Sequence, residues 1–334
     1  MEDRFIRQKQ IISFGEKGQE ALQKAKVLIV GCGGLGCPVA MYLSRAGVVH
    51  IGLVDGDVVQ LSNLHRQILF NEQDVGSLKV EAAQQALLLG NSDLLIQTYP
   101  YRLNTKNYKE ILSEYDVIID CSDNFETRYL VNDACVILKK PLVYGAANQL
   151  EGQVAVFNYM GSGNLRDVFP ELPKDGTIQN CEEAGVLGVI TGIIGDLMAW
   201  EVIKLITGVG KPLINTLMQF DGETSRLFSF NYTPNQSMIK PIVHSDLLQI
   251  TWQEYSAGAD TFQLVDVRTK EEREVGHKGG IHIPLSELQV RLTELEKYSN
   301  VAFYCQTGKR AIQAAGMCQN DFETTTITAI VGDL

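Results

Sequence analysis

Short apolar runs alternate with amphipathic stretches along the first part of the chain. The runs are rich in Val, Ile and Leu and have the length of buried strands. The stretches between them repeat apolar residues at helical spacing, and one ends at Gly47. The expected strands are 26–31, 48–55, 93–100, 115–123 and 141–147, and the expected helices are 31–47, 76–90 and 124–140. Strands that alternate with helices predict an α/β fold with a doubly wound, mostly parallel sheet.

The pattern then changes to strands in succession. Residues 151–159, 215–221 and 226–232 are typical of strands added to one edge, which would make the sheet mixed. Residues 161–180 form a long polar stretch rich in Gly and Pro, and loops of that length are usually functional or disordered. A long helix is expected at about 183–207.

A second, smaller α/β pattern follows a polar segment, "NYTPNQSMIKP". That segment is typical of a linker, and we expect it to separate two domains. The predicted divisions are a first domain at 1–232, a linker at 233–244 and a small α/β domain at 245–334.

Composition narrows the class of protein. The chain has 334 residues, enough for two or three domains, and its net charge of −11 argues against broad nucleic-acid binding. The chain has no run of about 18 apolar residues, so we expect no membrane span. The polar start "MEDRFIRQKQ" lacks the apolar core of a signal peptide. We therefore expect a cytoplasmic protein without a membrane contact.

The seven cysteines have no disulfide-like spacing and include no CxxC pair. In a reducing cytosol free thiols are the default, and a zinc site of the ribbon type is not expected.

A glycine-rich turn, "GCGGLG", follows the first strand and opens a helix. Small residues let the backbone approach a phosphate, and helix N-terminal amides favour its negative charge. Asp55, at the end of the second strand, suits a ribose hydroxyl. The glycines that we expect to bind nucleotide are Gly31, Gly33, Gly34 and Gly36. These features alone also fit NAD or FAD, so a Rossmann oxidoreductase is one alternative.

The neighbouring polar residues favour a triphosphate. Arg66 and Lys79 would supply cations for the phosphates, and Asp123, beyond the fourth strand, would supply a carboxylate for Mg²⁺. A hydride-transfer site has little need of this combination. Taken singly, Arg66 and Lys79 are more often solvated helix residues. The other candidate nucleotide contacts are Asp57, Asn63, Ser122 and Asn124.

Two cysteines are candidate reactive thiols. Cys181 precedes the long helix, whose dipole would favour a thiolate, although an inert thiol is the alternative. Cys305 ends a strand and begins "CQTGKR", a loop whose amides would point at the sulfur, with positive charge from Lys309 and Arg310. Such a loop of Cys305, Gln306, Thr307, Gly308, Lys309 and Arg310 suits a persulfide. A phosphatase-like loop, a redox thiol or a packed cysteine are the alternatives.

From about residue 3 to 230 the chain resembles the ThiF/MoeB-type adenylyltransferases, relatives of ubiquitin-activating enzymes. The matching stretches include "VLIVGCGGLGCPVAMYLSRAGV", "VDGDVVQLSNLHRQILF", "DCSDNFETRYLVND" and "NCEEAGVLGVITGIIGDLMAWEVIKLITG". The resemblance implies ATP binding by Gly34, Asp55, Asn63, Arg66, Lys79 and Asp123, with Mg²⁺ near Asp123. It also implies a homodimer in which Arg7 reaches the other subunit's site. By itself, Arg7 would more often be a solvated N-terminal residue.

One departure from this family concerns zinc. Many relatives hold zinc through two CxxC pairs, near "GNLRDVFP" and "FNYTPNQ" here, and neither stretch has a cysteine. We expect no structural zinc, with packing of the 161–180 loop in its place.

From about 245 to 334 the chain resembles rhodanese sulfurtransferases, through "LVDVRTKEEREVGHKGGIHIPL" and "CQTGKRA". Together the two resemblances imply ATP-dependent adenylation of a small ubiquitin-like sulfur-carrier protein at its C-terminal Gly-Gly. A Cys305 persulfide, loaded by a donor such as a cysteine desulfurase, would then give the thiocarboxylate, with Cys181 resolving the acyl disulfide. This chemistry is of the molybdopterin or thiamine type. A non-catalytic scaffold that binds the carrier through a degenerate rhodanese domain is the second alternative.

Overall fold

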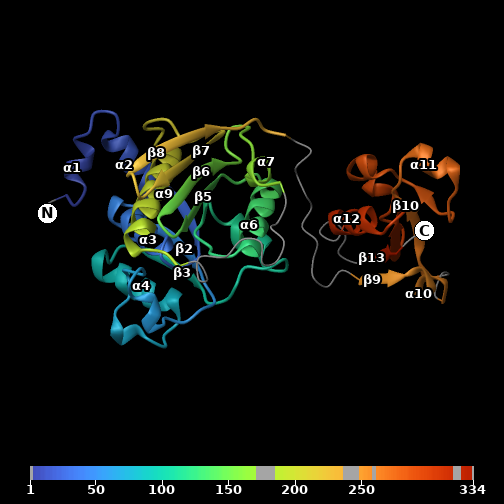
Figure 1. Cartoon of the computed structure of the whole chain (residues 1–334), viewed down its shortest axis with the longest axis horizontal. Helices are drawn as coiled ribbons and strands as arrows, with labels where there is room; N and C mark the ends of the chain where they lie inside the picture. Colours follow the sequence, from blue (N-terminus) through green and yellow to red (C-terminus); the bar gives the residue numbers. More distant parts are fainter. Residues whose placement is uncertain (1–2, 171–184, 236–247, 258–260, 319–324, 333–334) are drawn as a thin grey trace. The chain divides into compact units, whose positions relative to one another are not determined.

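The computed structural model describes residues 3–170, 185–235, 248–257, 261–318 and 325–332. The chain divides into two compact units, Met1–Ile239 and Lys240–Leu334 (Figure 1). In the described part of the chain, no helix is long and apolar enough to cross a membrane.

An eight-stranded sheet forms the centre of the first unit, in the order β3-β2-β1-β4-β5-β6-β7-β8. Its strands are β1 (Lys26–Val30), β2 (His50–Val54), β3 (Leu95–Tyr99), β4 (Val117–Asp120), β5 (Leu142–Asn148), β6 (Glu151–Phe157), β7 (Thr216–Asp221) and β8 (Arg226–Asn231). Strands β1 to β5 pair in parallel, and β6 to β8 continue the sheet antiparallel. The expected mixed, doubly wound sheet is confirmed. Because β1 lies between β2 and β4, the strand order reverses there, which is where such sheets bind ligands.

Helices cover both faces of this sheet, with α3 and α9 on one side and α6 on the other (Figure 1). The helices of the unit are α1 (Ile6–Lys9), α2 (Gly15–Lys24), α3 (Gly36–Ala46), α4 (Lys79–Gly90), α5 (Tyr108–Ser113), α6 (Phe125–Leu138), α7 (Leu165–Val168) and α9 (Gly188–Thr207). Helix α3 ends where expected, because Gly47 takes a left-handed conformation with φ of 105°.

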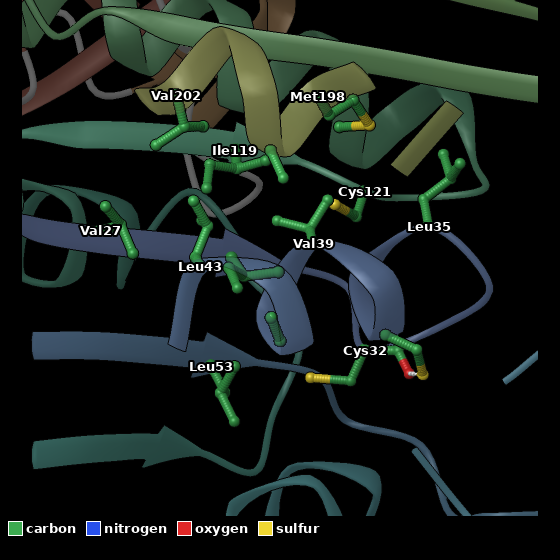
Figure 2. Close-up of a cluster of buried hydrophobic side chains, with 14 of the residues drawn as sticks. Val27, Cys32, Leu35, Val39, Leu43, Leu53, Ile119, Cys121, Met198 and Val202 are labelled. Carbon is green, nitrogen blue, oxygen red and sulfur yellow. Dashed lines mark hydrogen bonds between the residues drawn. The ribbon is translucent and has the colours of Figure 1, made fainter. Parts of the chain in front are cut away.

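The core lies between the strands and the helices α3 and α9. Figure 2 shows Val27 of β1 and Ile119 of β4 near Val39 and Leu43 of α3, with Val202 of α9 above them. All five side chains are fully buried. Each such side chain contributes about 1.5–3 kcal/mol through its removal from water. This packing fixes the strand ends that carry the polar site.

The long helix begins later than expected, at Gly188 rather than near 183. Val186 makes a β-bridge with Gln149, and Gln149 also accepts a backbone hydrogen bond from Leu187, so the residues just before the helix are extended. The dipole argument for Cys181 assumed a helix start near 183, whereas α9 begins at Gly188. Cys181 itself lies outside the described residues.

The loop 161–180, expected to pack in place of a structural zinc, is described as far as residue 170. Asp167 in this loop contacts the chain at Asn235 through a hydrogen bond. The backbone N–H of Asn235 donates to the Asp167 carboxylate at 2.7 Å. The rest of the expected loop, 171–180, lies outside the described residues.

The second unit is a five-stranded parallel sheet in the order β11-β10-β12-β13-β9. Its elements are β9 (Leu248–Thr251), α10 (Trp252–Ala257), β10 (Gln263–Asp266), α11 (Lys270–Val275), β11 (Ile281–His282), β12 (Asn300–Tyr304), α12 (Lys309–Cys318) and β13 (Thr326–Val331). The core strands β10, β12 and β13 and the helix α12 match the expected pattern. Strands β9 and β11 had no separate signal in the sequence.

Candidate functional site

Two adjoining hollows open at the carboxyl ends of β1, β2 and β4. The first hollow is lined by Val30, Gly31, Gly33, Val54, Asp55, Gly56, Asp57, Lys79, Arg102, Leu103, Cys121, Ser122, Asp123, Asn124 and Thr127. The second hollow is lined by Gly33, Gly34, Leu35, Arg66, Gln67, Cys121, Ser122, Asp123, Arg128, Ala147, Val186 and Thr191. Asp123 faces both hollows, so most of the nucleotide contacts expected from the sequence share one crevice.

The glycine turn has two positions at which a side chain would not fit. Gly31 has φ of 98°, and a Cβ there would lie 2.7 Å from the backbone oxygen of Cys121. A Cβ on Gly36 would lie 2.0 Å from the oxygen of Gly31. Gly36 lines neither hollow, and its lack of a side chain allows the close approach of helix α3 to the turn.

The Asp55 carboxylate holds the backbone on two sides of the first hollow. Its two carboxylate oxygens accept from the N–H of Cys32 at 2.8 Å and of Asp57 at 2.9 Å. Burial raises the pKa of Asp55, although Lys79 and these hydrogen bonds oppose the effect. A carboxylate oxygen has two lone pairs, so each can still accept from a ribose hydroxyl.

Lys79 brings a nearly buried ammonium into the same hollow. It begins α4, and its Nζ donates to Asp57 Oδ2 at 3.1 Å. Burial lowers the pKa of Lys79, but the carboxylates of Asp55 and Asp57 outweigh it and raise the pKa above its ordinary value. The lysine is therefore a fixed cation at neutral pH.

Arg102 also reaches Asp57, and the sequence reading did not include it. Its Nη2 donates to Asp57 Oδ1 at 3.2 Å. Arg102 follows the carboxyl end of β3, and that position at the edge of a parallel sheet is the signal that could have identified it.

Arg66 lines the second hollow but Asn63 lines neither. The Arg66 guanidinium donates to the backbone oxygen of Ser62 at 3.2 Å and lies 2.8 Å from His65 Nε2. Asn63 is buried, and its side chain accepts from the N–H of Gln60 at 3.1 Å. In this structure Asn63 shapes the turn that carries Arg66.

A buried arginine, Arg128, holds the turn at Ser122, which lines both hollows. We did not identify this arginine from the sequence. It donates to the backbone oxygens of Ser122 at 2.7 Å and Gly145 at 3.2 Å, and pairs with Asp120 at 3.5 Å. The Ser122 hydroxyl donates to Asp120 at 2.5 Å. These contacts orient the turn that presents Asp123.

Asn124, expected to contact the nucleotide, caps helix α6. Its side chain accepts from the N–H of Thr127 at 2.9 Å. It lines the first hollow as well. Arg7 lies on α1, exposed, with its guanidinium 3.5 Å from Gln10 Oε1.

Cys305 stands at the end of β12 in the second unit, followed by the expected loop. Its residue is 2% exposed, and Gly308 turns the chain with φ of 82° before α12 begins at Lys309. Gln306 and Thr307 are exposed on this loop, and Gln306 faces a hollow that His277 and Lys278 also line.

The positive charge expected beside Cys305 is partly cancelled. The Arg310 guanidinium makes two hydrogen bonds to Glu272 of α11, at 2.7 and 2.6 Å, and also interacts with the Cys305 thiol. Arg310 lowers the pKa of Glu272 to about 2, so this partner stays ionised. Lys309 remains as an exposed cation on the loop.

The remaining described cysteines are buried, as expected for packed thiols. They are Cys32, Cys37, Cys121, Cys135 and Cys318. Burial raises the pKa of Cys32, Cys37, Cys121 and Cys135 above the ordinary thiol value. These four thiols therefore stay protonated and unreactive at neutral pH.

A glycine turn, a fixed lysine and an acidic turn at the switch point of a doubly wound sheet define a nucleotide-binding protein, here joined to a small α/β unit with a loop cysteine. The chain belongs to the ThiF family, whose model matches residues 7–239. Residues 251–332 match the rhodanese-like domain.

The chain is also similar to curated proteins over much of its length. The chain is 41% identical over 317 residues to "Adenylyltransferase and sulfurtransferase MOCS3" of Culex quinquefasciatus, covering 85% of this chain and 72% of that protein. It is 48% identical over 225 residues to "Sulfur carrier protein adenylyltransferase" of Thermus thermophilus, covering 66% of this chain and 83% of the relative.

A solved structure of E. coli MccB with ATP superposes with a TM-score of 0.60 at 25% identity, covering 70% of this chain and 72% of that one. This similarity supports the α/β fold.

Proposed function

We propose that this chain adenylates the C-terminal glycine of a small ubiquitin-like sulfur-carrier protein with ATP and then converts the adenylate into a thiocarboxylate. The observation that carries the proposal is the gathering of Asp55, Lys79, Arg66 and Asp123 around one glycine turn. The names of the relatives agree with this activity and give no support to the oxidoreductase alternative.

In the first step the carrier's carboxylate oxygen attacks the α-phosphorus of ATP, and the bond to pyrophosphate breaks. Asp55 would hold the ribose, and the ammonium of Lys79 and the guanidinium of Arg66 would bind the phosphates. These groups position the reactants and stabilise charge, which is most of what such a transfer requires. The product is an acyl-adenylate with AMP as a good leaving group.

The residues present fit a magnesium ion held mainly by the nucleotide. Mg²⁺ usually keeps several waters and takes one or two protein carboxylates beside substrate phosphates. Asp123, facing both hollows, supplies such a carboxylate, and the described residues contain no group of three His, Cys, Asp or Glu that would cage a metal. The ion would neutralise phosphate charge.

In the second step the outer sulfur of a Cys305 persulfide attacks the acyl carbon and AMP leaves. The thiolate of Cys181 then attacks Sγ of Cys305, which releases the carrier thiocarboxylate and leaves a Cys181–Cys305 disulfide for a cellular thiol to reduce. A cysteine desulfurase persulfide is the proposed sulfur source. Arg310, tied to Glu272, would hold the loop around the sulfur.

The proposed organisation is an adenylating domain at 1–232, a linker at 233–244 and a sulfur-transferring domain at 245–334. We further propose a cytoplasmic homodimer in which Arg7 of one subunit completes the other's site. The pathway class is that of molybdopterin or thiamine synthesis.

The test is ATP–pyrophosphate exchange with Gly-Gly carriers from the same genome, followed by mass spectrometry for a gain of about 16 Da, the difference between oxygen and sulfur. Cys305→Ala should keep exchange and lose the sulfur product, because the thiol acts only after adenylation. Absence of exchange with every carrier would refute the adenylation. Normal sulfur transfer by Cys305→Ala would refute the role of the loop.

A further inference from the structure

Asp57 lines the first hollow, but its carboxylate is already bound by two cations of this chain. One carboxylate oxygen accepts from Lys79 Nζ at 3.1 Å and the other from Arg102 Nη2 at 3.2 Å. The backbone oxygen of Asp57 accepts from the N–H of Lys79 at 3.0 Å. Asp57 therefore holds both the main chain and the side chain of the lysine.

Charge argues against direct contact between Asp57 and the phosphates. A carboxylate that faced a triphosphate would repel it, whereas a carboxylate bound by two cations is neutralised. Burial raises the pKa of Asp57, but Lys79 and Arg102 outweigh it and lower the pKa below its ordinary value. Asp57 thus stays ionised and keeps both hydrogen bonds at neutral pH.

The ammonium of Lys79 has three donors, so it can keep Asp57 while it binds a phosphate. Its side chain is 8% exposed, while the side chain of Arg102 is 78% exposed. Exposed ion pairs contribute little to stability. What Arg102 fixes is the orientation of Asp57 at the rim of the hollow.

We propose that Asp57 and Arg102 are positioning residues for nucleotide binding: Asp57 aims the ammonium of Lys79 at the phosphates, and Arg102 acts only through Asp57. The proposal rests on the ATP-dependent function above and deepens it. The rival is that Arg102, which also lines the first hollow, contacts the nucleotide directly.

A double-mutant cycle separates the two roles. The full-length chain is titrated with a non-hydrolysable ATP analogue, using Asp57→Ala, Arg102→Gln and the double variant. Lys109→Gln is the matched control, because Lys109 is an exposed cation close by in the chain that lines neither hollow. Asp57→Ala should weaken binding about ten- to a hundredfold and Arg102→Gln about two- to fivefold.

The double variant should bind as Asp57→Ala alone does, and Lys109→Gln as the wild type. Multiplied effects in the double variant would overturn the proposal, because Arg102 would then touch the nucleotide. Adenosine lacks phosphates, so its affinity would fall if Asp57→Ala damaged the site as a whole but not if only phosphate contacts were lost. Its binding should be unchanged in Asp57→Ala, and an equal loss for adenosine and the analogue would overturn the positioning role. A wild-type chain that binds no ATP analogue would refute the proposed function instead.

Discussion

Replacing Asp133 by alanine tests whether a buried ion pair anchors helix α7, in the loop expected to pack in place of a structural zinc. Arg166 Nε and Nη2 donate to the two oxygens of Asp133 at 2.7 and 2.6 Å, and both side chains are about 10% exposed or less. The guanidinium also lies over the Tyr129 ring at 4.7 Å. Asp133→Ala would leave a buried cation without its acceptor.

Breaking a buried pair on one side costs about 3–5 kcal/mol of unfolding free energy. For a unit of 150–250 residues, each kcal/mol shifts the melting midpoint by about 2–4 °C, so the expected loss is roughly 6–20 °C. The matched control is Glu20→Ala, which breaks an exposed pair with Lys24 at 3.7 Å and should cost less than about 1 kcal/mol.

Thermal unfolding followed by circular dichroism, with and without EDTA, measures both effects. Asp133→Leu combined with Arg166→Met should recover much of the loss, because no buried charge remains unpaired. A shift for Asp133→Ala no larger than that of Glu20→Ala would refute the anchoring role. A large drop in the wild-type melting temperature with EDTA, with metal found by elemental analysis, would show that a metal anchors this segment.

Further outcomes concern the glycine turn and the cysteine loop. Gly36→Ala should destabilise the first unit by about 1–3 kcal/mol in urea titrations, because its Cβ would lie 2.0 Å from the Gly31 oxygen. The Glu272–Arg310 pair should stabilise the second unit above pH 4.5 and lose this effect as pH falls toward about 2, because the folded-state pKa of Glu272 is depressed. Between pH 5 and 2.5 the melting temperature should therefore fall more steeply with decreasing pH for the wild type than for Glu272→Gln. Arg310→Lys should lower sulfur transfer but not pyrophosphate exchange, because lysine cannot form the two-point pair.

Much of the fold follows from local signals in the sequence. Strands β1, β2 and β4 are short runs rich in Val, Ile and Leu, and helix α3 is bounded by the glycine turn and by Gly47. The expected residues Asp55, Lys79 and Asp123 lie together because the carboxyl ends of β1, β2 and β4 meet at one edge. Whether these residues bind ATP stays a prediction.

Features decided by distant contacts did not follow from local pattern. The start of α9 could not be found, because "GVLGVITG" is almost entirely apolar and its first residues are kept extended by contacts of Val186 and Leu187 with the distant Gln149. No sequence motif links Glu272 to Arg310, so the partial cancellation of charge beside Cys305 could not be predicted either.

The position of Arg66 shows why a motif alone does not make this site. Arg66 belongs to a turn whose backbone rests on the first residue of α9: a Cβ on Gly188 would lie 2.3 Å from the oxygen of His65 and 3.2 Å from the Cα of Arg66. A helix that packs against β5 and β6 thus sets how far Arg66 stands from the glycine turn. Since Val186, just before that helix, lines the same hollow as Arg66, the packing of α9 positions both residues. The chemistry assigned to Arg66 therefore depends on the packing of α9 as much as on the arginine itself.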